Sequence, residues 1–268
     1  MNESIKAKKL NEVKYLFEPK LFTFETKVVS FKKDEIKKGT QFYRIELEDT
    51  IFHAKGGGQP NDIGKITSLE ESDPNLQAEF IVQEVIADLQ QNSIYHLGTL
   101  KNEQLIFKEN QKVNLQIDKD RRELNSRLHS AGHLLSSIVT EGLKLPIVGF
   151  KGNHYPKQCF VEFEGVIENL QTQRDQIISK IQNAIDEAIA NKLVLHRQIV
   201  SKDKLPEVCY SVPQTVFFDP VQVVSIGDFK GNICGGTHVE HIGEIGKLVI
   251  KKINQKKSVT RISYDIVD

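Results

Sequence analysis

Two pairs of side chains that could bind a metal stand at the same spacing in this sequence. His129 and His133 lie four residues apart in "HSAGHLL", and Cys234 and His238 lie four residues apart in "CGGTH". Three imidazoles and one thiolate form a suitable tetrahedral ligand set for zinc. Thiolate with imidazole also favours zinc over magnesium or calcium, which prefer oxygen ligands. If the two pairs meet in the fold, we expect one zinc ion per chain.

Each pair also has an interpretation without a metal. Two histidines four residues apart share one face of a helix, at about 5–6 Å between Cβ atoms, and could simply be buried with hydrogen-bond partners. Cys234 could be a buried thiol, or a nucleophile with a histidine as its base. The two glycines after Cys234 favour a tight loop, because glycine permits backbone angles that are closed to other residues. The presence of both pairs in one chain favours the metal site.

A helix must present the two histidines, and the sequence predicts one over 118–139. Asp118 or Asp120 can cap its N-terminus. Apolar residues recur there at offsets of four and three, which is typical of one buried helix face. This face comprises Leu124, Leu128, Ala131, Leu135 and Ile138. A second amphipathic helix is predicted over 170–192, with four apolar residues in register: Ile178, Ile181, Ile185 and Ala188.

The segments on both sides of these helices have the pattern of β-strands. Period-two alternation predicts four strands before the first helix, at 21–31, 42–49, 78–86 and 112–118. Strand patterns return at 159–165, 221–229, 246–253 and 258–266. We therefore expect an α+β protein with two domains. Residues 1–118 should form a small β-barrel domain, and residues 119–268 should form a domain in which helices pack on a mainly antiparallel sheet.

The composition excludes few functions. The 36 basic and 36 acidic residues cancel, so a nucleic-acid partner is neither required nor excluded, because a local basic patch can bind a polyanion. No apolar run near the N-terminus resembles a secretory signal, and none reaches the roughly 20 residues that span a bilayer. Three cysteines are a small, odd number that is typical of a reducing compartment. We expect a cytoplasmic protein.

A Gly-rich loop, "AKGGGQPNDIG", interrupts the N-terminal strands at 54–64. Together with "RRELNSRLHSAGHLL" and "GDFKGNICGGTHVEHIGEIG", this loop resembles the alanyl-tRNA editing proteins. These proteins, often called AlaX, are free-standing relatives of the editing domain of alanyl-tRNA synthetase. The resemblance covers nearly the whole chain. The residues from 119 onward are similar to the editing domain, and residues 1–118 are similar to the small barrel that precedes it in longer members.

The resemblance implies an activity and assigns residues to it. It implies a zinc-dependent hydrolase that cleaves the ester between a wrong amino acid and tRNA(Ala). Seryl-tRNA(Ala) is the usual target of the family and glycyl-tRNA(Ala) is another. The zinc ligands of the family carry over onto His129, His133, Cys234 and His238. The glutamine of the Gly-rich loop carries over onto Gln59, near the aminoacyl end of the substrate. The implied partner is tRNA(Ala), and the protein would be a monomer or a homodimer.

Zinc could act on the ester or only organise the pocket, because four protein ligands usually form a closed structural site. The resemblance favours a catalytic or positioning zinc with a zinc-bound water as the catalytic group, and no separate general base is identifiable. Selection of serine over alanine needs polar groups that alanine leaves unpaired, at a cost of roughly 1–3 kcal/mol. Gln59 and Thr237 are the candidates. Gly57 and Gly58 could expose backbone N–H groups to the substrate, although all four could also be plain loop residues.

Basic residues that could contact tRNA phosphates cluster in two places. Arg121, Arg122 and Arg127 lie on the first predicted helix, and Lys251 and Lys252 lie in the C-terminal strands. Each alone has the character of a solvated charge, but together they are expected to form an electrostatic footprint.

Five further histidines have no partner at ligand spacing, and we expect surface or core positions for them: His53, His96, His154, His196 and His241. Two rival functions stay open. The chain could be a zinc-stabilised RNA-binding module without catalysis, or a hydrolase of small aminoacyl esters that needs no tRNA.

Overall fold

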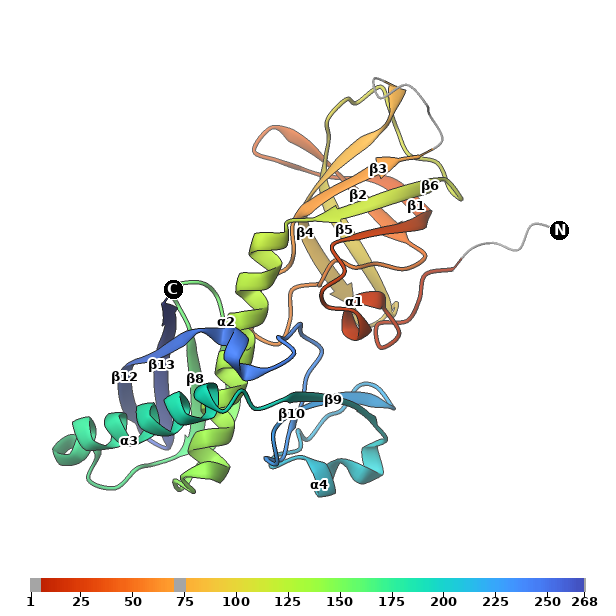
Figure 1. Ribbon diagram of the computed structural model, residues 1–268. Coiled ribbons are helices and arrows are strands. Elements are labelled where there is room, and N and C mark those ends of the chain that lie inside the picture. The colour runs from red at the N-terminus through yellow and green to blue at the C-terminus, as the bar shows by residue number, and fades with distance from the viewer. Residues whose placement is uncertain (1–5, 70–75, 268) are drawn as a thin grey trace. The chain divides into compact units, whose positions relative to one another are not determined.

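The computed structural model describes residues 6–69 and 76–267, and the chain divides into two compact units (Figure 1). One unit comprises Met1–Gly56 and Pro60–Arg122, and the other comprises Gly57–Gln59 and Glu123–Asp268. Three residues of the Gly-rich loop therefore pack with the C-terminal unit, although the chain on both sides of them belongs to the N-terminal unit. No helix among the described residues is both long enough and apolar enough to cross a membrane.

The N-terminal unit is a closed barrel of antiparallel strands in the order β1-β2-β5-β4-β3-β6, which confirms the expected β-barrel. The strands are β1 (Thr23–Lys37), β2 (Thr40–Leu47), β3 (Gly64–Ser68), β4 (Glu79–Asp88), β5 (Ser93–Leu100) and β6 (Lys112–Ile117), and a short helix α1 (Lys14–Phe17) precedes them. Alternate side chains fill the barrel. In β6, for example, Val113, Leu115 and Ile117 are buried, whereas Lys112 and Gln116 are exposed.

The C-terminal unit combines two antiparallel sheets with two long helices, which confirms the expected α+β class. One sheet has the order β12-β13-β8-β7 and the other has the order β11-β10-β9. The strands are β7 (Ile147–Asn153), β8 (Phe160–Gly165), β9 (Leu195–Val200), β10 (Val221–Ile226), β11 (Asn232–Ile233), β12 (Lys247–Lys256) and β13 (Val259–Val267). The helices are α2 (Lys119–Ser137), α3 (Leu170–Ala190) and α4 (Leu205–Val208), with shorter helical turns at Ile138–Gly142, Lys202–Lys204 and Ile242–Ile245.

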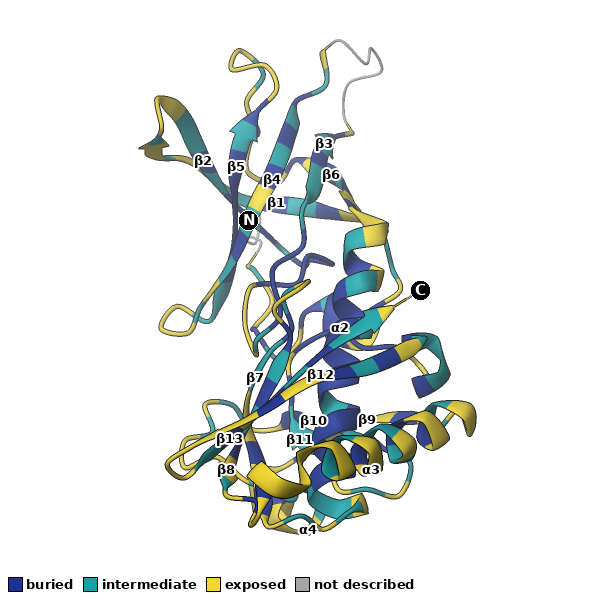
Figure 2. Ribbon diagram, turned by 90° about the vertical axis from the view of Figure 1, so that its left-hand side faces the viewer, coloured by how far each residue is buried: buried dark blue, intermediate teal, exposed yellow. Residues whose placement is uncertain are grey.

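Helix α2 carries both histidines of the "HSAGHLL" motif, and its start and its buried face are as predicted. The Asp118 carboxylate accepts the backbone N–H of Arg121 at 3.0 Å, so Asp118 is the residue that caps the helix. Leu128, Ala131 and Leu135 are buried in the core of the C-terminal unit. The helix is buried along most of its length, as Figure 2 shows by its dark colour. Most of its buried polar side chains have partners inside the protein, but neither amide atom of Asn125 has one among the described residues.

Helix α3 lies on the sheet that contains β12 and exposes a long outer face (Figure 2). Ile181 and Ile185 are fully buried in the core, as the periodicity predicts. The Gln182 amide fixes the helix to β12, because it donates to the Leu248 carbonyl at 2.7 Å and accepts the Ile250 N–H at 2.9 Å. Apolar burial and one bridging amide thus hold this helix in place.

Arg122, at the first turns of α2, is buried with an exposed fraction of 1%. Its guanidinium donates to the Asp62 carboxylate and to the carbonyls of Pro19 and Ile51, all within the N-terminal unit. The Asp62 side chain is fully buried as well, and it also accepts the His53 N–H at 2.7 Å. This corrects the expectation that Arg122 contacts tRNA, because its charge is already compensated inside the protein and is closed to a phosphate.

Candidate metal centre

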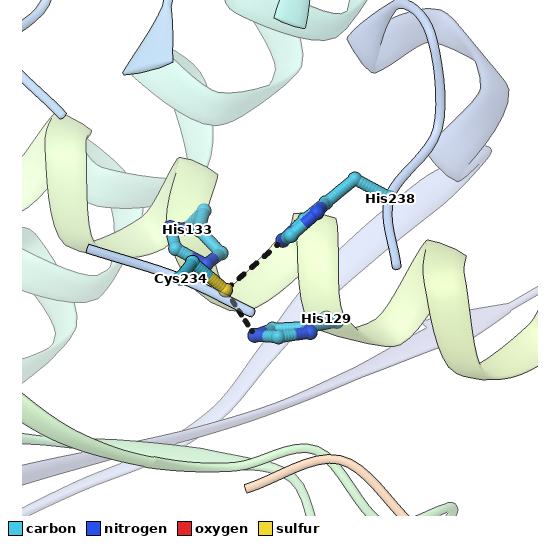
Figure 3. Close-up of side chains that lie close together, drawn as sticks. All are labelled: His129, His133, Cys234 and His238. Carbon is cyan, nitrogen blue, oxygen red and sulfur yellow. Dashed lines mark hydrogen bonds between the residues drawn. The ribbon is translucent and has the colours of Figure 1, made fainter. Parts of the chain in front are cut away.

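The two pairs of candidate ligands meet, as the sequence predicts. The ligand atoms of His129, His133, Cys234 and His238 all lie within 4.8 Å of one another. The first two residues come from α2 and the other two from the loop after β11, and Figure 3 shows the four side chains converging. His133 is partly exposed, whereas the other three are buried. The cluster is therefore largely buried.

The distances fit a zinc ion. The Cys234 sulfur lies 3.5 Å from Nε2 of His129 and 3.5 Å from Nε2 of His238. Zinc binds thiolate at about 2.3 Å and imidazole at about 2.05 Å, and a tetrahedron of those bond lengths separates the two atoms by about 3.6 Å. The donor set and these two separations are thus consistent with a zinc ion.

Gln59 fixes the ring of His129. The Oε1 atom of Gln59 accepts the backbone N–H of Thr237 at 3.0 Å, and this identifies the atom as the oxygen, since an amide N–H can only donate. The same oxygen lies 2.7 Å from Nδ1 of His129, so Nδ1 must carry the proton. The lone pair of His129 is therefore on Nε2, which faces the Cys234 sulfur. Such a partner on the other ring nitrogen is usual for a histidine that binds a metal.

The "CGGTH" loop is held against α2 and β10. The Cys234 N–H donates to the Gln222 carbonyl at 3.0 Å, and the Gln222 amide donates to the Cys234 carbonyl at 2.9 Å. The Val239 N–H donates at 3.1 Å to the hydroxyl of Ser130, the residue that follows His129 in α2. These bonds place the cysteine and the helix at a fixed separation.

The glycines of this loop were expected to allow backbone angles that are closed to other residues, but the structure gives a different reason for them. Neither has a positive φ angle, so the loop does not depend on left-handed backbone conformations. A Cβ atom on Gly236 would lie 2.3 Å from Nδ1 of His129 and 2.8 Å from Oε1 of Gln59, whereas one on Gly235 would meet nothing within 4 Å. Gly236 is required because the loop passes directly against the ligand ring and the amide that orients it.

Burial sets the protonation of the ligands in the absence of a cation. It raises the pKa of the Cys234 thiol to about 12, against a small opposite effect of the Gly236 N–H. It lowers the pKa of His133 to about 4, so this imidazole is neutral and keeps a lone pair at neutral pH. The thiolate is the form that binds a metal, so a metal ion would have to displace the proton of this thiol on binding.

Gln59 and Thr237, which are predicted to bind a seryl hydroxyl, are hydrogen-bonded to each other. Gln59 donates to the Thr237 hydroxyl at 2.8 Å, and that hydroxyl lies 2.8 Å from the Ser126 hydroxyl. The exposed fractions of Gln59 and Thr237 are 0% and 1%. Their described contacts thus support the loop and His129. Gly57 and Gly58 have φ angles of +57° and +77°, a conformation that favours glycine.

His154 is a member of the site that the sequence does not reveal. It is buried, in agreement with the expected surface or core position, and its ring stacks on that of His129 with centroids 4.6 Å apart and an interplanar angle of 25°. Burial, and to a lesser degree the neighbouring His133, lowers its pKa to about 3. The other four unassigned histidines are not in the cluster. No spacing rule connects residue 154 to the ligands, so only the fold brings it there.

The remaining basic residues differ in how available they are. Arg127 donates twice to the Ile245 carbonyl, at 3.1 and 3.0 Å, and is half-buried. Arg121 donates to the Asn61 carbonyl at 3.0 Å and is also half-buried. Lys251 and Lys252 are exposed on β12. The two lysines are therefore the members of the predicted footprint best placed to meet a phosphate.

Gln59→Ala is expected to weaken both zinc binding and any activity of the site by about 10- to 100-fold, since loss of a partner that orients a metal-bound histidine has effects of this size. Zinc affinity would be measured by competition with a chromogenic chelator. Gln116→Ala, which removes an exposed glutamine from β6, is the matched control. An unchanged zinc affinity in the Gln59 variant would show that the amide does not orient His129.

Comparison with known proteins identifies relatives of this chain. Residues 221–263, which include Cys234 and His238, match the family described as "Threonyl and Alanyl tRNA synthetase second additional domain". The alanyl-tRNA editing protein AlaX-L of Pyrococcus horikoshii is 28% identical over 93% of this chain and 56% of its own length. AlaX-M of Methanosarcina barkeri is 28% identical over 87% of this chain and 93% of its own length. An alanine--tRNA ligase of Fervidobacterium nodosum is 30% identical over 75% of this chain and 22% of its own length.

The fold and the site define a class: a β-barrel unit joined to an α+β unit that contains a cluster of three histidines and one cysteine suited to a metal ion. Within that class, the chain resembles the alanyl-tRNA editing proteins over most of its length, which confirms the resemblance expected from its motifs. The chain spans about half the length of two of these relatives: 56% of AlaX-L, and 51% of a putative alanyl-tRNA editing protein of Saccharomyces cerevisiae that is 26% identical over 85% of this chain.

Proposed function

We propose that this protein hydrolyses the ester that links a wrong amino acid to tRNA(Ala), with seryl-tRNA(Ala) as the main substrate and glycyl-tRNA(Ala) as a second. The observation that carries the proposal is the convergence of His129, His133, Cys234 and His238 in a chain similar to proteins named for alanyl-tRNA editing. The products are the free amino acid and tRNA, and the reaction belongs with translation in the cytoplasm.

One zinc ion per chain is part of the proposal. Bound to these four ligands, zinc would supply a Lewis acid that polarises an ester carbonyl and lowers the pKa of water. The protein's own groups prepare the site for it. Gln59 holds His129 with its lone pair toward the sulfur, and the loop bonds of Cys234 hold the thiolate in place.

The editing role also explains why such a site is useful. Serine exceeds alanine by one hydroxyl, and a synthetase pocket built for alanine cannot strongly reject a ligand that only adds this group. A second site that requires the hydroxyl can remove the error afterwards. Exposed Lys251 and Lys252 are proposed to contact the phosphates of the bound tRNA, with the usual sensitivity of such contacts to salt.

The test is deacylation of seryl-, glycyl- and alanyl-tRNA(Ala) side by side by the zinc-loaded protein. We expect the seryl ester to be hydrolysed fastest and the alanyl ester to remain intact. A seryl minihelix without the identity pair of tRNA(Ala) should be hydrolysed more slowly than the full substrate. Binding of tRNA without hydrolysis would identify an RNA-binding module instead, and equal rates on free aminoacyl esters would identify a general esterase.

A further inference from the structure

A fifth imidazole, that of His154, lies against the candidate metal centre without being one of its four ligands. It follows β7 directly and stacks on the ring of His129 at 4.6 Å between centroids. Only 5% of its surface is exposed. A buried polar ring beside a cluster of ligands needs partners of its own, and those partners indicate what it does.

Three glycines from separate segments leave the space that the His154 ring occupies. A Cβ atom on Gly132 would lie 2.2 Å from Cε1 of His154, and one on Gly152 would lie 2.3 Å from Nε2. A Cβ atom on Gly58 would lie 3.2 Å from Cδ2 of the same ring. Gly132 is inside helix α2, where alanine would be more favourable by about 1 kcal/mol. The helix, β7 and the Gly-rich loop are thus all shaped around this imidazole.

Tyr264 fixes the tautomer of His154. The Tyr264 hydroxyl donates its only proton to the Leu128 carbonyl at 2.8 Å. Its oxygen also lies 2.6 Å from Nδ1 of His154, and it must accept there, so Nδ1 carries the proton of the ring. The acceptor of the imidazole is therefore Nε2. This atom has no hydrogen-bond partner among residues 6–69 and 76–267, and it is not among the fully buried polar atoms that lack one.

The other polar groups expected to bind a substrate hydroxyl already form hydrogen bonds within the protein. The Gln59 amide is bonded to His129 and Thr237, and the Thr237 hydroxyl is bonded to Gln59 and Ser126. Nε2 of His154 has no such partner among the described residues, and its ring lies against that of the ligand His129. It suits a donor with one proton to give, and a hydroxyl is the only donor that serine has and alanine and glycine lack.

We propose that Nε2 of His154 accepts a hydrogen bond from the side-chain hydroxyl of the aminoacyl group, and so makes the site selective for seryl esters. This inference rests on the proposed function. With glycine or alanine bound, Nε2 would lose its contact with water and gain no partner, which is how a polar site rejects a ligand without the matching group. His154 is then a substrate-contacting residue for specificity, while the four ligands serve every ester alike.

Two amide substitutions separate the ring nitrogens. His154→Asn can still donate to Tyr264 from the position of Nδ1, but it has no acceptor at the position of Nε2. His154→Gln places its oxygen near the position of Nε2 and gives up the bond to Tyr264. We expect the Asn variant to lose at least about tenfold in the ratio of kcat/KM on seryl-tRNA(Ala) to kcat/KM on glycyl-tRNA(Ala), because the seryl contact and the unpaired acceptor that disfavours glycine are both removed. The Gln variant should recover most of the seryl rate, and both should hold wild-type amounts of zinc.

Binding provides a readout that does not depend on turnover. Adenosine whose 3′-hydroxyl is replaced by an amine acylated with serine or with glycine is a stable mimic, and its Kd can be measured by calorimetry. Wild-type protein should bind the seryl mimic more tightly than the glycyl mimic, and the Asn variant should bind both equally. Equal losses on both mimics, or no loss on either, would overturn the role of His154. A wild-type protein that hydrolyses none of the aminoacyl-tRNAs would instead overturn the proposed function.

Discussion

The double variant His129→Ala/His133→Ala is expected to contain no zinc and to hydrolyse seryl-tRNA(Ala) no faster than the uncatalysed background. Both side chains come from α2, and their removal leaves only Cys234 and His238 within reach of the ion. Two ligands from a loop are too few for the usual tetrahedral site. The zinc content measured by elemental analysis should fall from one ion per chain to none, and the deacylation rate should fall by at least about three orders of magnitude.

His196→Ala is the matched control for this variant, because it removes an exposed imidazole from β9. It should keep its zinc and its rate. Circular dichroism would show whether the double variant keeps its helices. Retention of metal in the double variant would refute the ligand set. Loss of metal with an undiminished rate would show that the cluster serves folding, and the catalytic group would then have to be sought elsewhere.

Arg122→Met is expected to lower the free energy of unfolding by about 3–5 kcal/mol, the usual cost of breaking a buried ion pair on one side. The substitution leaves the Asp62 carboxylate with a full charge inside the protein. It also removes the donors to the carbonyls of Pro19 and Ile51. Urea denaturation followed by circular dichroism would measure the effect on the folding of the N-terminal unit.

Arg121→Met, at a half-buried position on the same turn, should cost much less and serves as control. The double variant Arg122→Met/Asp62→Asn should be more stable than Arg122→Met alone. The asparagine carries no charge, and its oxygen can still accept the His53 N–H. A single variant as stable as the wild type would mean that the ion pair contributes nothing net to folding.

Long periodic segments were predictable from the sequence, whereas strands β5 and β7 were not. Helices α2 and α3 and strands such as β6 and β13 follow apolar patterns that local geometry imposes. Strand β7 was not predicted because a glycine, Gly149, occupies one of its buried positions. A Cβ atom at this position would lie 2.2 Å from the Ser136 hydroxyl oxygen. Strand β5 was not predicted because five consecutive residues from Ile94 to Gly98 are buried, so that polar and apolar residues do not alternate along it.

Some residues of the candidate site were likewise predictable from the sequence, and others were not. The ligands were predictable because each pair is local in sequence, with a spacing of four that has a geometric meaning. His154 was not, because its neighbours are distant along the chain: Gly58, Gly132 and Tyr264 are brought to it only by the fold. Gly236 was recognised as a loop residue, but its reason, the close approach of the His129 ring, also depends on a tertiary contact.

The assignment of Gly57–Gln59 to the C-terminal unit bears on how such a protein can be shortened or recombined. A gene that encodes only residues 123–268 still specifies all four candidate ligands. It omits Gln59, however, and with it the acceptor that sets the protonated nitrogen of His129. Exchange of the N-terminal segment between homologues would likewise exchange that acceptor. The C-terminal unit therefore depends on a residue encoded between two segments of the N-terminal unit, and a functional fragment would have to retain it.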